Sequence, residues 1–180
     1  SGQAPSDGRT AEIPADAGAR KSDDVASLMA RARALSRKID VVRADLDAAS
    51  ALIDQAVKLD PTNAEAWATR ALVDWRYADS YLDRSPARFD AVRQHARQAM
   101  SIDPTNATAQ FAQALALVLL NGNASTREAA VKMLEPLAES PDVDVDGLLS
   151  LSLLESSNLD KARAYLDRAE SDAVQGRRDR

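Results

Sequence analysis

The sequence predicts an all-α fold in which pairs of antiparallel helices stack side by side. The chain has 180 residues and is 45% hydrophobic, but only 4% of it is aromatic, so small and aliphatic side chains supply most of its apolar surface. Apolar residues recur at helical spacing over most of the chain. The pentapeptide Asp-Pro-Thr-Asn-Ala occurs twice, at 60–64 and 103–107. Such internal repetition is typical of stacked helical repeats.

The chain divides into a helical domain and two tails. Residues 1–22 hold three of the six glycines, two of the seven prolines and one large apolar residue, Ile13. Such a segment buries too little surface to offset the entropy lost on ordering, so we expect a flexible linker. The helical domain is expected at 23–172 and a basic tail at 173–180. Because the sequence begins with Ser1 rather than Met, we expect a piece of a longer protein.

The first helices are delimited by caps and by the first pentapeptide. Ser22 or Asp23 can cap the first helix, whose apolar stripe continues to Leu35. A second stripe covers 46–59 and ends at the first Asp-Pro, after a long connection at 39–45. Within each pentapeptide the proline ends one helix and the asparagine caps the next.

Caps and prolines also delimit the later helices. Ser85 and Pro86 begin a helix with a capping residue and a proline in its first turn. Ser125 and Glu128 have the spacing of a capping box, and Pro136 is expected to kink or end the helix that follows them. One further helix is expected to open at Ala64, and another carries the apolar positions from Phe111 to Val118 and stops at 121–123. The last two helices are expected at 147–155 and 158–171.

These residues resemble tetratricopeptide repeats, in which each unit is a pair of helices. The clearest unit has Leu149 on its first helix, with Ala162 and Leu166 on its second, and the middle unit carries Trp67 on its first helix. The resemblance covers roughly residues 23–171. It implies a right-handed α-solenoid of about four antiparallel helix pairs.

The repeat departs from the family pattern in one place. The two pentapeptides are 43 residues apart, whereas a plain repeat spans about 34 residues. The extra residues fall between Trp75 and Ser85 and include Tyr77 and Tyr81. This aromatic and charged insertion fits either a binding surface or packing of a long helix on its own repeat. An irregular α-solenoid of another type is the alternative fold.

The resemblance implies that the first helices of successive pairs line a concave groove that binds a peptide. Such an apolar groove suits an amphipathic helix or an extended apolar peptide. The Lys, Arg and Asn with which some members grip a C-terminal carboxylate are mostly missing, so that mode is not expected. The alternative is that Phe111 and Leu115 are core between neighbouring helices. By spacing, the partner-binding positions are Leu72, Trp75, Arg76, Phe111, Leu115, Val118 and Leu119.

The composition offers little for catalysis or cofactors. Without cysteine the chain has no disulfide, thiol nucleophile or thiolate metal ligand. His95 is the only histidine, and we expect it to be solvated or packed without a catalytic role. Residues 142–147 begin like a calcium loop, but Leu153 stands where the bidentate glutamate is needed. We therefore expect no enzyme, no cofactor and no metal site.

The partner is expected to be a protein or peptide. A net charge of −5 argues against nucleic acid, which needs a basic face. No stretch reaches the roughly 18 uncharged apolar residues of a membrane span. The alternative function is a rigid spacer or a homo-oligomerisation domain of a larger protein. The sequence indicates no compartment.

Overall fold

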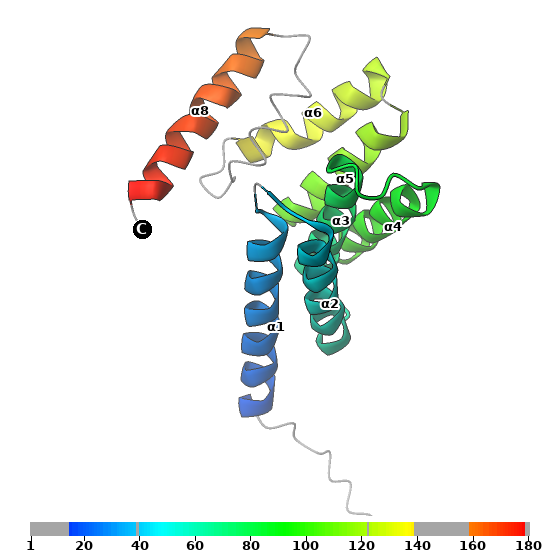
Figure 1. The fold of residues 1–180 in the computed structure, drawn as a ribbon, viewed down its shortest axis with the longest axis vertical. Coiled ribbons are helices and arrows are strands. Elements are labelled where there is room, and N and C mark those ends of the chain that lie inside the picture. The colour runs from blue at the N-terminus through cyan, green and yellow to red at the C-terminus, as the bar shows by residue number, and fades with distance from the viewer. Residues whose placement is uncertain (1–14, 39, 122, 139–158, 179–180) are drawn as a thin grey trace, which may run out of the picture.

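The computed structural model describes residues 15–38, 40–121, 123–138 and 159–178 (Figure 1). All the regular secondary structure in these residues is α-helical, which confirms the all-α prediction. None of the described helices has the length and apolar character needed to cross a bilayer. The helices are α1 (Ala15–Ser36), α2 (Arg43–Leu59), α3 (Ala64–Asp79), α4 (Pro86–Ile102), α5 (Ala107–Asn121), α6 (Ala124–Ala138) and α8 (Leu159–Arg178).

The outer helices are longer than the sequence pattern indicates. Helix α1 begins at Ala15, inside the segment predicted as a linker, because good helix formers surround Gly18. Helix α8 continues to Arg178, through most of the segment predicted as a tail. Residues 1–14, the helix expected at 147–155 and the acidic stretch at 142–147 lie outside the described residues.

The helices pack in consecutive pairs, α1 with α2, α3 with α4 and α5 with α6. Helix α2 also packs on α3, and α4 packs on α5, so each pair of helices packs against the next pair. The first helices of successive pairs touch directly, α1 with α3 and α3 with α5. Helix α8 lies beside α6, where Lys161 Nζ is 2.5 Å from Glu135 Oε1.

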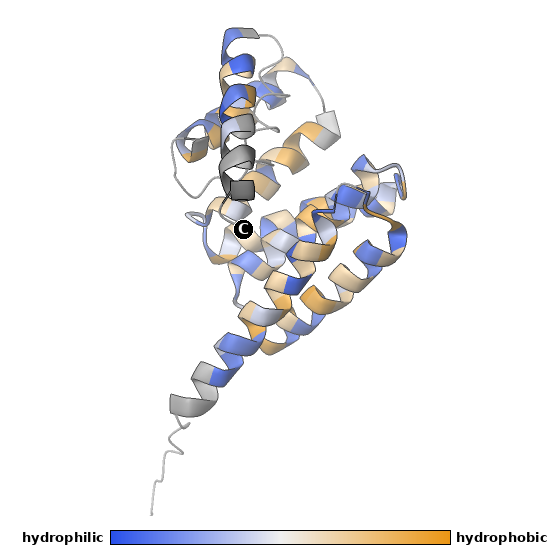
Figure 2. Ribbon diagram, turned by 60° about the vertical axis from the view of Figure 1, so that its left-hand side comes forward, coloured by the Kyte–Doolittle hydropathy of each residue, from blue (hydrophilic) through white to orange (hydrophobic). Residues whose placement is uncertain are grey.

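Three apolar clusters fill the spaces between the helices. The first joins α1, α2 and α3 and contains the fully buried Leu46 and Ile53. Each such side chain contributes roughly 1.5–3 kcal/mol when buried. The second joins α3, α4 and α5, and Val92 is its only buried member that is not alanine. The third joins α5 and α6 around Leu134. Figure 2 shows hydrophobic residues gathered where the helices meet.

The two pentapeptides form the same turn. Asn63 Oδ1 accepts a hydrogen bond from the backbone N–H of Ala66 at 2.9 Å, which confirms the predicted cap of α3. Asn106 Oδ1 accepts from the N–H of Ala109 at the same distance. Ahead of each asparagine, an aspartate accepts from the backbone N–H and hydroxyl of the threonine two residues on.

Residues 43–79 and 86–121 are therefore two copies of one helix–turn–helix step. The first helix of each copy, α2 or α4, has 17 residues. At equivalent positions Trp67 Nε1 donates to the carbonyl oxygen of Pro61 at 2.9 Å, and Gln110 Nε2 donates to that of Pro104 at 2.8 Å. An offset of 43 residues relates every position in the two copies.

The insertion between the two copies is a helix end and a short loop. Helix α3 ends in a Schellman motif, in which the N–H of Leu82 donates to the carbonyl of Tyr77 and that of Tyr81 donates to Ala78. Tyr81 occupies the left-handed position, with φ of 58°, and its side chain is 79% exposed. Ser85 then caps α4, as predicted.

The start and end of α6 differ from the prediction. Asn123, not Ser125, is the capping residue, because its Oδ1 accepts from the N–H of Thr126 at 2.9 Å. The asparagine precedes the helix directly, so its side chain reaches the first free N–H groups. Pro136 does not end the helix, which continues to Ala138.

Candidate functional site

The densest group of titratable side chains in the described chain surrounds Asp74. Its side chain is fully buried in the middle of α3, at the contact with α4. One carboxylate oxygen accepts hydrogen bonds from Arg70 and Arg88, and Nδ1 of His95 lies 2.8 Å from the other oxygen. We call Asp74, Arg70, Arg88 and His95 the Asp74 centre.

Each partner reaches the carboxylate from a place that its helix dictates. Arg70 lies one turn before Asp74 on α3, so the two side chains share a face. Arg88 and His95 are two turns apart on the facing side of α4. The imidazole of His95 also stacks on Trp67, with ring centroids 5.6 Å apart. The centre therefore joins α3 to α4 at two places on α4, two helical turns apart.

Arg88 also links the Asp74 centre to the loop between α3 and α4. Its guanidinium also contacts Asp83 at 3.1 Å and lies over the ring of Tyr77 at 4.1 Å. Burial opposes the charge on Arg88, but its hydrogen bonds to Asp83 and Asp74 outweigh this and raise its pKa. Bonds from the backbone and hydroxyl of Ser85, and from Arg88, lower the pKa of Asp83 to about 2.

Arg70 extends the same network toward α2. It contacts Asp54 Oδ1 at 3.1 Å and Ser50 Oγ at 3.2 Å, both on α2. Nearby, the hydroxyl of Tyr77 donates to Asp47. Burial of the Tyr77 ring and then this contact with a carboxylate raise the pKa of the phenol. Helix α3 is thus held by charged and polar contacts on two sides.

The chemistry that the Asp74 centre can perform is that of a structural charge cluster. A buried carboxylate is stable when hydrogen bonds and opposite charges compensate its lost hydration, and three donors do so here. An Asp–His pair can also orient a general base, but no described side chain contacts the second imidazole nitrogen as a nucleophile would. Within the described ranges no three His, Asp or Glu side chains are grouped as a metal site requires.

The sequence pattern alone did not predict this centre: it gives His95 no partner and does not single out Asp74. The available signal was a carboxylate between Val73 and Trp75 in an Ala-rich helix, with Arg70 four residues before it. An acidic residue within an apolar stripe indicates a buried charge with partners.

The predicted groove residues on α3 have two kinds of environment. Leu72 and Trp75 are half-buried and pack against the cluster of α3, α4 and α5. Arg76 instead donates to the carbonyl oxygens of Ser36, at 3.3 Å, and Lys38, at 3.2 Å. It therefore satisfies carbonyls at the end of α1 and ties that helix to α3.

The predicted residues on α5 also divide. Phe111 and Val118 are half-buried against the cluster of α5 and α6, which Tyr165 of α8 also contacts. Leu115 is only 6% exposed, so it has little surface left for a partner. The side chain of Leu119 lies outside the described part of the structure. Four of the seven predicted residues thus keep accessible apolar surface on neighbouring helices.

A second polar link lies across the first helices of the three pairs. Glu65, at the start of α3, contacts Arg33 on α1 and accepts a hydrogen bond from Thr108 on α5 at 3.0 Å. Glu65 and Thr108 occupy equivalent positions in the two copies of the step. Helices α3 and α5 therefore lie side by side with their N-terminal ends together.

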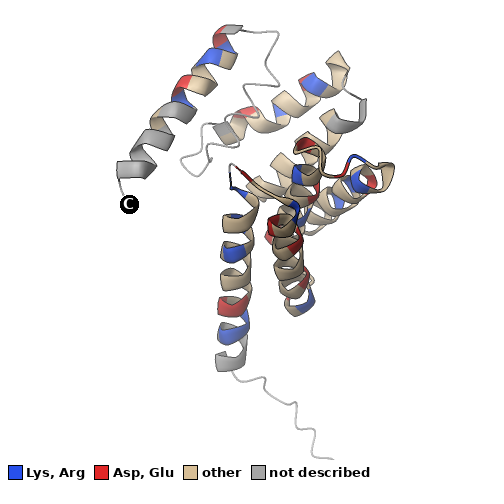
Figure 3. Cartoon of the chain, in the orientation of Figure 1, with Lys and Arg blue, Asp and Glu red and all other residues tan. Residues whose placement is uncertain are grey.

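Charged residues of both signs are interspersed over the described chain rather than gathered on one face (Figure 3). Comparison with known proteins finds no family model that matches this chain and no curated protein with significant similarity to it.

Proposed function

We propose that this protein is an interaction module that binds a segment of a partner protein across α3 and α5. The contact surface is formed by Leu72 and Trp75 on α3 and by Phe111 and Val118 on α5. The observation that carries the proposal is that these four large apolar side chains are only half-buried on two adjacent helices. We call them the apolar face.

The helix arrangement supports a tetratricopeptide-like solenoid as the scaffold for this face. The same helix–turn–helix step occurs twice, and the first helices of successive pairs are direct neighbours. Repeating one step of this kind generates a curved array in which α3, α5 and their equivalents would line one surface. We propose that the apolar face belongs to that surface.

The chemistry of the apolar face indicates the kind of segment it binds. Leucine, tryptophan, phenylalanine and valine recognise other apolar side chains, which an amphipathic helix or an extended apolar peptide would supply. The gain is about 25 cal/mol for each Å² of apolar surface removed from water, reduced by the cost of ordering the peptide. Trp75 is the natural anchor, since tryptophan is enriched among binding hot spots.

The test uses a peptide selected from a displayed random library against the purified chain. Binding of the labelled peptide is measured by fluorescence anisotropy. The double variant Leu72→Glu, Val118→Glu should weaken binding at least tenfold and keep the wild-type helicity, since both side chains are half-buried. Leu115 is left unchanged, because a charge at that buried site would test folding instead.

Gln55→Glu, at an exposed position on α2 outside both proposed sites, is the matched control for added charge and should bind as wild type. Equal binding by the double variant and the control would refute the apolar face as the site. Light scattering separates the alternative function: a dimer that the double variant converts to monomer would show that the face joins copies of this chain instead.

A further inference from the structure

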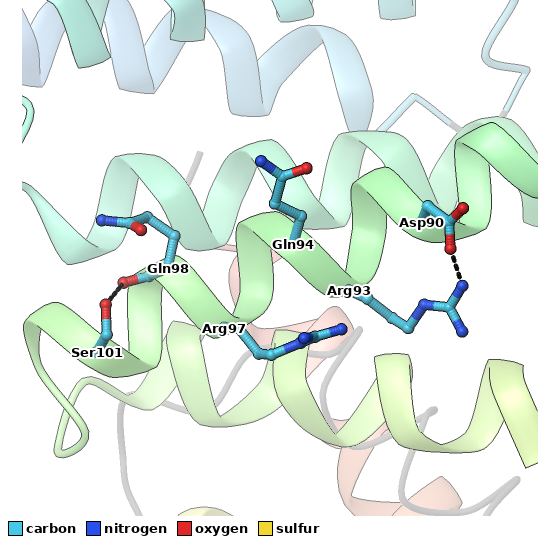
Figure 4. Close-up of a pocket in the computed structure, with 6 residues that line it drawn as sticks. All are labelled: Asp90, Arg93, Gln94, Arg97, Gln98 and Ser101. Carbon is cyan, nitrogen blue, oxygen red and sulfur yellow. Dashed lines mark hydrogen bonds and ion pairs between the residues drawn. The ribbon is translucent and has the colours of Figure 1, made fainter.

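Helix α4 carries a polar hollow that the proposed function does not use. Its volume is about 570 Å³, and all of its lining residues belong to this one helix. Figure 4 shows Arg93 and Arg97 extending over the same side of the helix, while Gln94 points away from them. The lining residues are Asp90, Arg93, Gln94, Arg97, Gln98 and Ser101.

The equivalent side of α2 shows what is unusual about this hollow. Arg93 and Arg97 take the positions of Ser50 and Asp54, 43 residues earlier. On α2 those two side chains are contacted by Arg70 of the following helix. Between α2 and α3, acidic and basic groups therefore compensate each other within the chain.

The second copy of the step has no such compensation. Gln113 occupies the position of Arg70. Only an acidic side chain at this position could compensate Arg97, and the amide of Gln113 is neutral. The amide oxygen of Gln113 is buried, and no hydrogen-bond donor reaches it from the described residues. The basic residues of α4 thus have no acidic counterpart on α5.

Arg97 is the free charge in the hollow. Arg93 pairs with Asp90 on its own helix, and Gln98 accepts a hydrogen bond from Ser101 through its backbone carbonyl. Arg97 is exposed and forms no ion pair within the described ranges. An arginine can bind a carboxylate through two parallel hydrogen bonds, and the amides of Gln94 and Gln98 can add further hydrogen bonds to a peptide.

We propose that the hollow on α4 binds an acidic peptide segment, with Arg97 contacting one of its carboxylates. An acidic peptide fits this hollow because its carboxylates would complement the unpaired positive charge of Arg97. Nucleic acid is disfavoured because Asp90 lies in the same hollow and the whole chain has a net charge of −5. The site is separate from the apolar face, so the two proposals stand or fall independently.

The test is a titration of ¹⁵N-labelled protein with a short poly-glutamate peptide at low salt, followed by two-dimensional NMR. Amide shift changes should centre on residues 90–101 of α4. Arg97→Glu should weaken binding about tenfold, and Arg97→Gln about threefold, as expected for the loss of one partly exposed charge pair. Arg31→Glu on α1 is the control, since Arg31 is equally exposed and forms no ion pair with any described residue.

Four results would overturn the proposal: shift changes elsewhere than α4, equal binding of a poly-glutamine peptide, tighter binding of an oligothymidine strand, or unchanged affinity in Arg97→Glu. The amide spectrum of each variant shows directly whether it is folded. The double variant of the apolar face should bind poly-glutamate normally, which separates this site from the proposed function.

Discussion

The two copies of the helix–turn–helix step have the same turn and the same arrangement of helices, but they differ in the side chains at their helix contacts. In the first copy, Arg70 and Asp74 place charges on α3 that reach α2 on one side and α4 on the other. In the second copy, Gln113 and Leu117 occupy these positions. The turn residues set the geometry of the step, and the side chains at the helix contacts decide whether polar or apolar contacts hold it.

The two copies also differ in where their charged side chains lie. Arg70 and Asp74 of the first copy are directed into the array, where Arg88 and His95 of the second copy complete the compensation of the fully buried carboxylate. On α4 of the second copy, Arg93 pairs with Asp90, whereas Arg97 is exposed and forms no ion pair with a described residue. Identical turns thus support one internal charge cluster in the first copy and, on α4 of the second copy, the surface for which we propose an acidic partner segment.

The largest expected effect comes from Asp74→Ala, which removes the acceptor from three buried or half-buried donors. Breaking one side of a buried charge cluster costs about 3–5 kcal/mol. Leu117→Ala, at the equivalent and only half-buried position, should cost about 2 kcal/mol, the low end for leucine. Urea denaturation measures both. An equal or smaller loss in Asp74→Ala would end the contrast between the two copies.

The next largest effect on stability is expected at the asparagine caps, which the two copies share. Asn63→Ala and Asn106→Ala each remove one capping hydrogen bond of 2.9 Å. Each should lower the free energy of unfolding by about 1 kcal/mol. Thermal denaturation followed by circular dichroism provides the comparison. Costs that differ by more than about 1 kcal/mol would show that the turns are not equivalent.

The loop between the copies offers a stabilising change. Tyr81→Gly should raise the free energy of unfolding by about 0.5 kcal/mol, because glycine adopts the left-handed backbone at φ of 58° without steric cost. Tyr81→Ala loses the same stacking with Arg84 but keeps the strain, so it should bring no gain. Urea midpoints of the two variants decide, and a gain in the alanine variant would contradict the argument from strain.

The smallest effect is a dependence of stability on acid pH. The pKa of Asp83 is lowered from 3.8 to about 2, and the pKa values of Asp60 and Asp103 are lowered by hydrogen bonds from threonines. Because these pKa values are lower in the folded state, the stabilisation is present above about pH 4 and is lost as the pH falls toward 2. Asp83→Asn should make the decline of the urea midpoint shallower between pH 4 and pH 2. An unchanged slope would show that Asp83 gains nothing on folding.

Local signals in the sequence were enough for the all-α fold class and for the turns. Helical periodicity and the two pentapeptides predicted the all-α class and the turn after each of α2 and α4, because an Asx cap and a proline act within a few residues. The linker boundary was placed too late, since helix propensity around Gly18 outweighed the loss of apolar spacing.

The Asp74 centre was beyond the same reasoning. Its partners Arg88 and His95 are 14 and 21 residues away in the sequence, and only the packing of α4 on α3 brings them together. Likewise, the spacing that predicted Arg76 as a partner-binding residue could not show that the end of α1 already uses its guanidinium. Spacing in the sequence predicts on which face of its own helix a residue lies. Which other part of the chain contacts that face depends on how the helices pack.

We have proposed that a partner segment lies on the apolar face and that the Asp74 centre is structural. A spin label on the selected library peptide tests this through the loss of amide signals in the ¹⁵N-labelled protein. Broadening is expected around Leu72, Trp75 and Val118 on α3 and α5. Broadening confined to the outer sides of α2 and α4, with α3 and α5 unchanged, would contradict it.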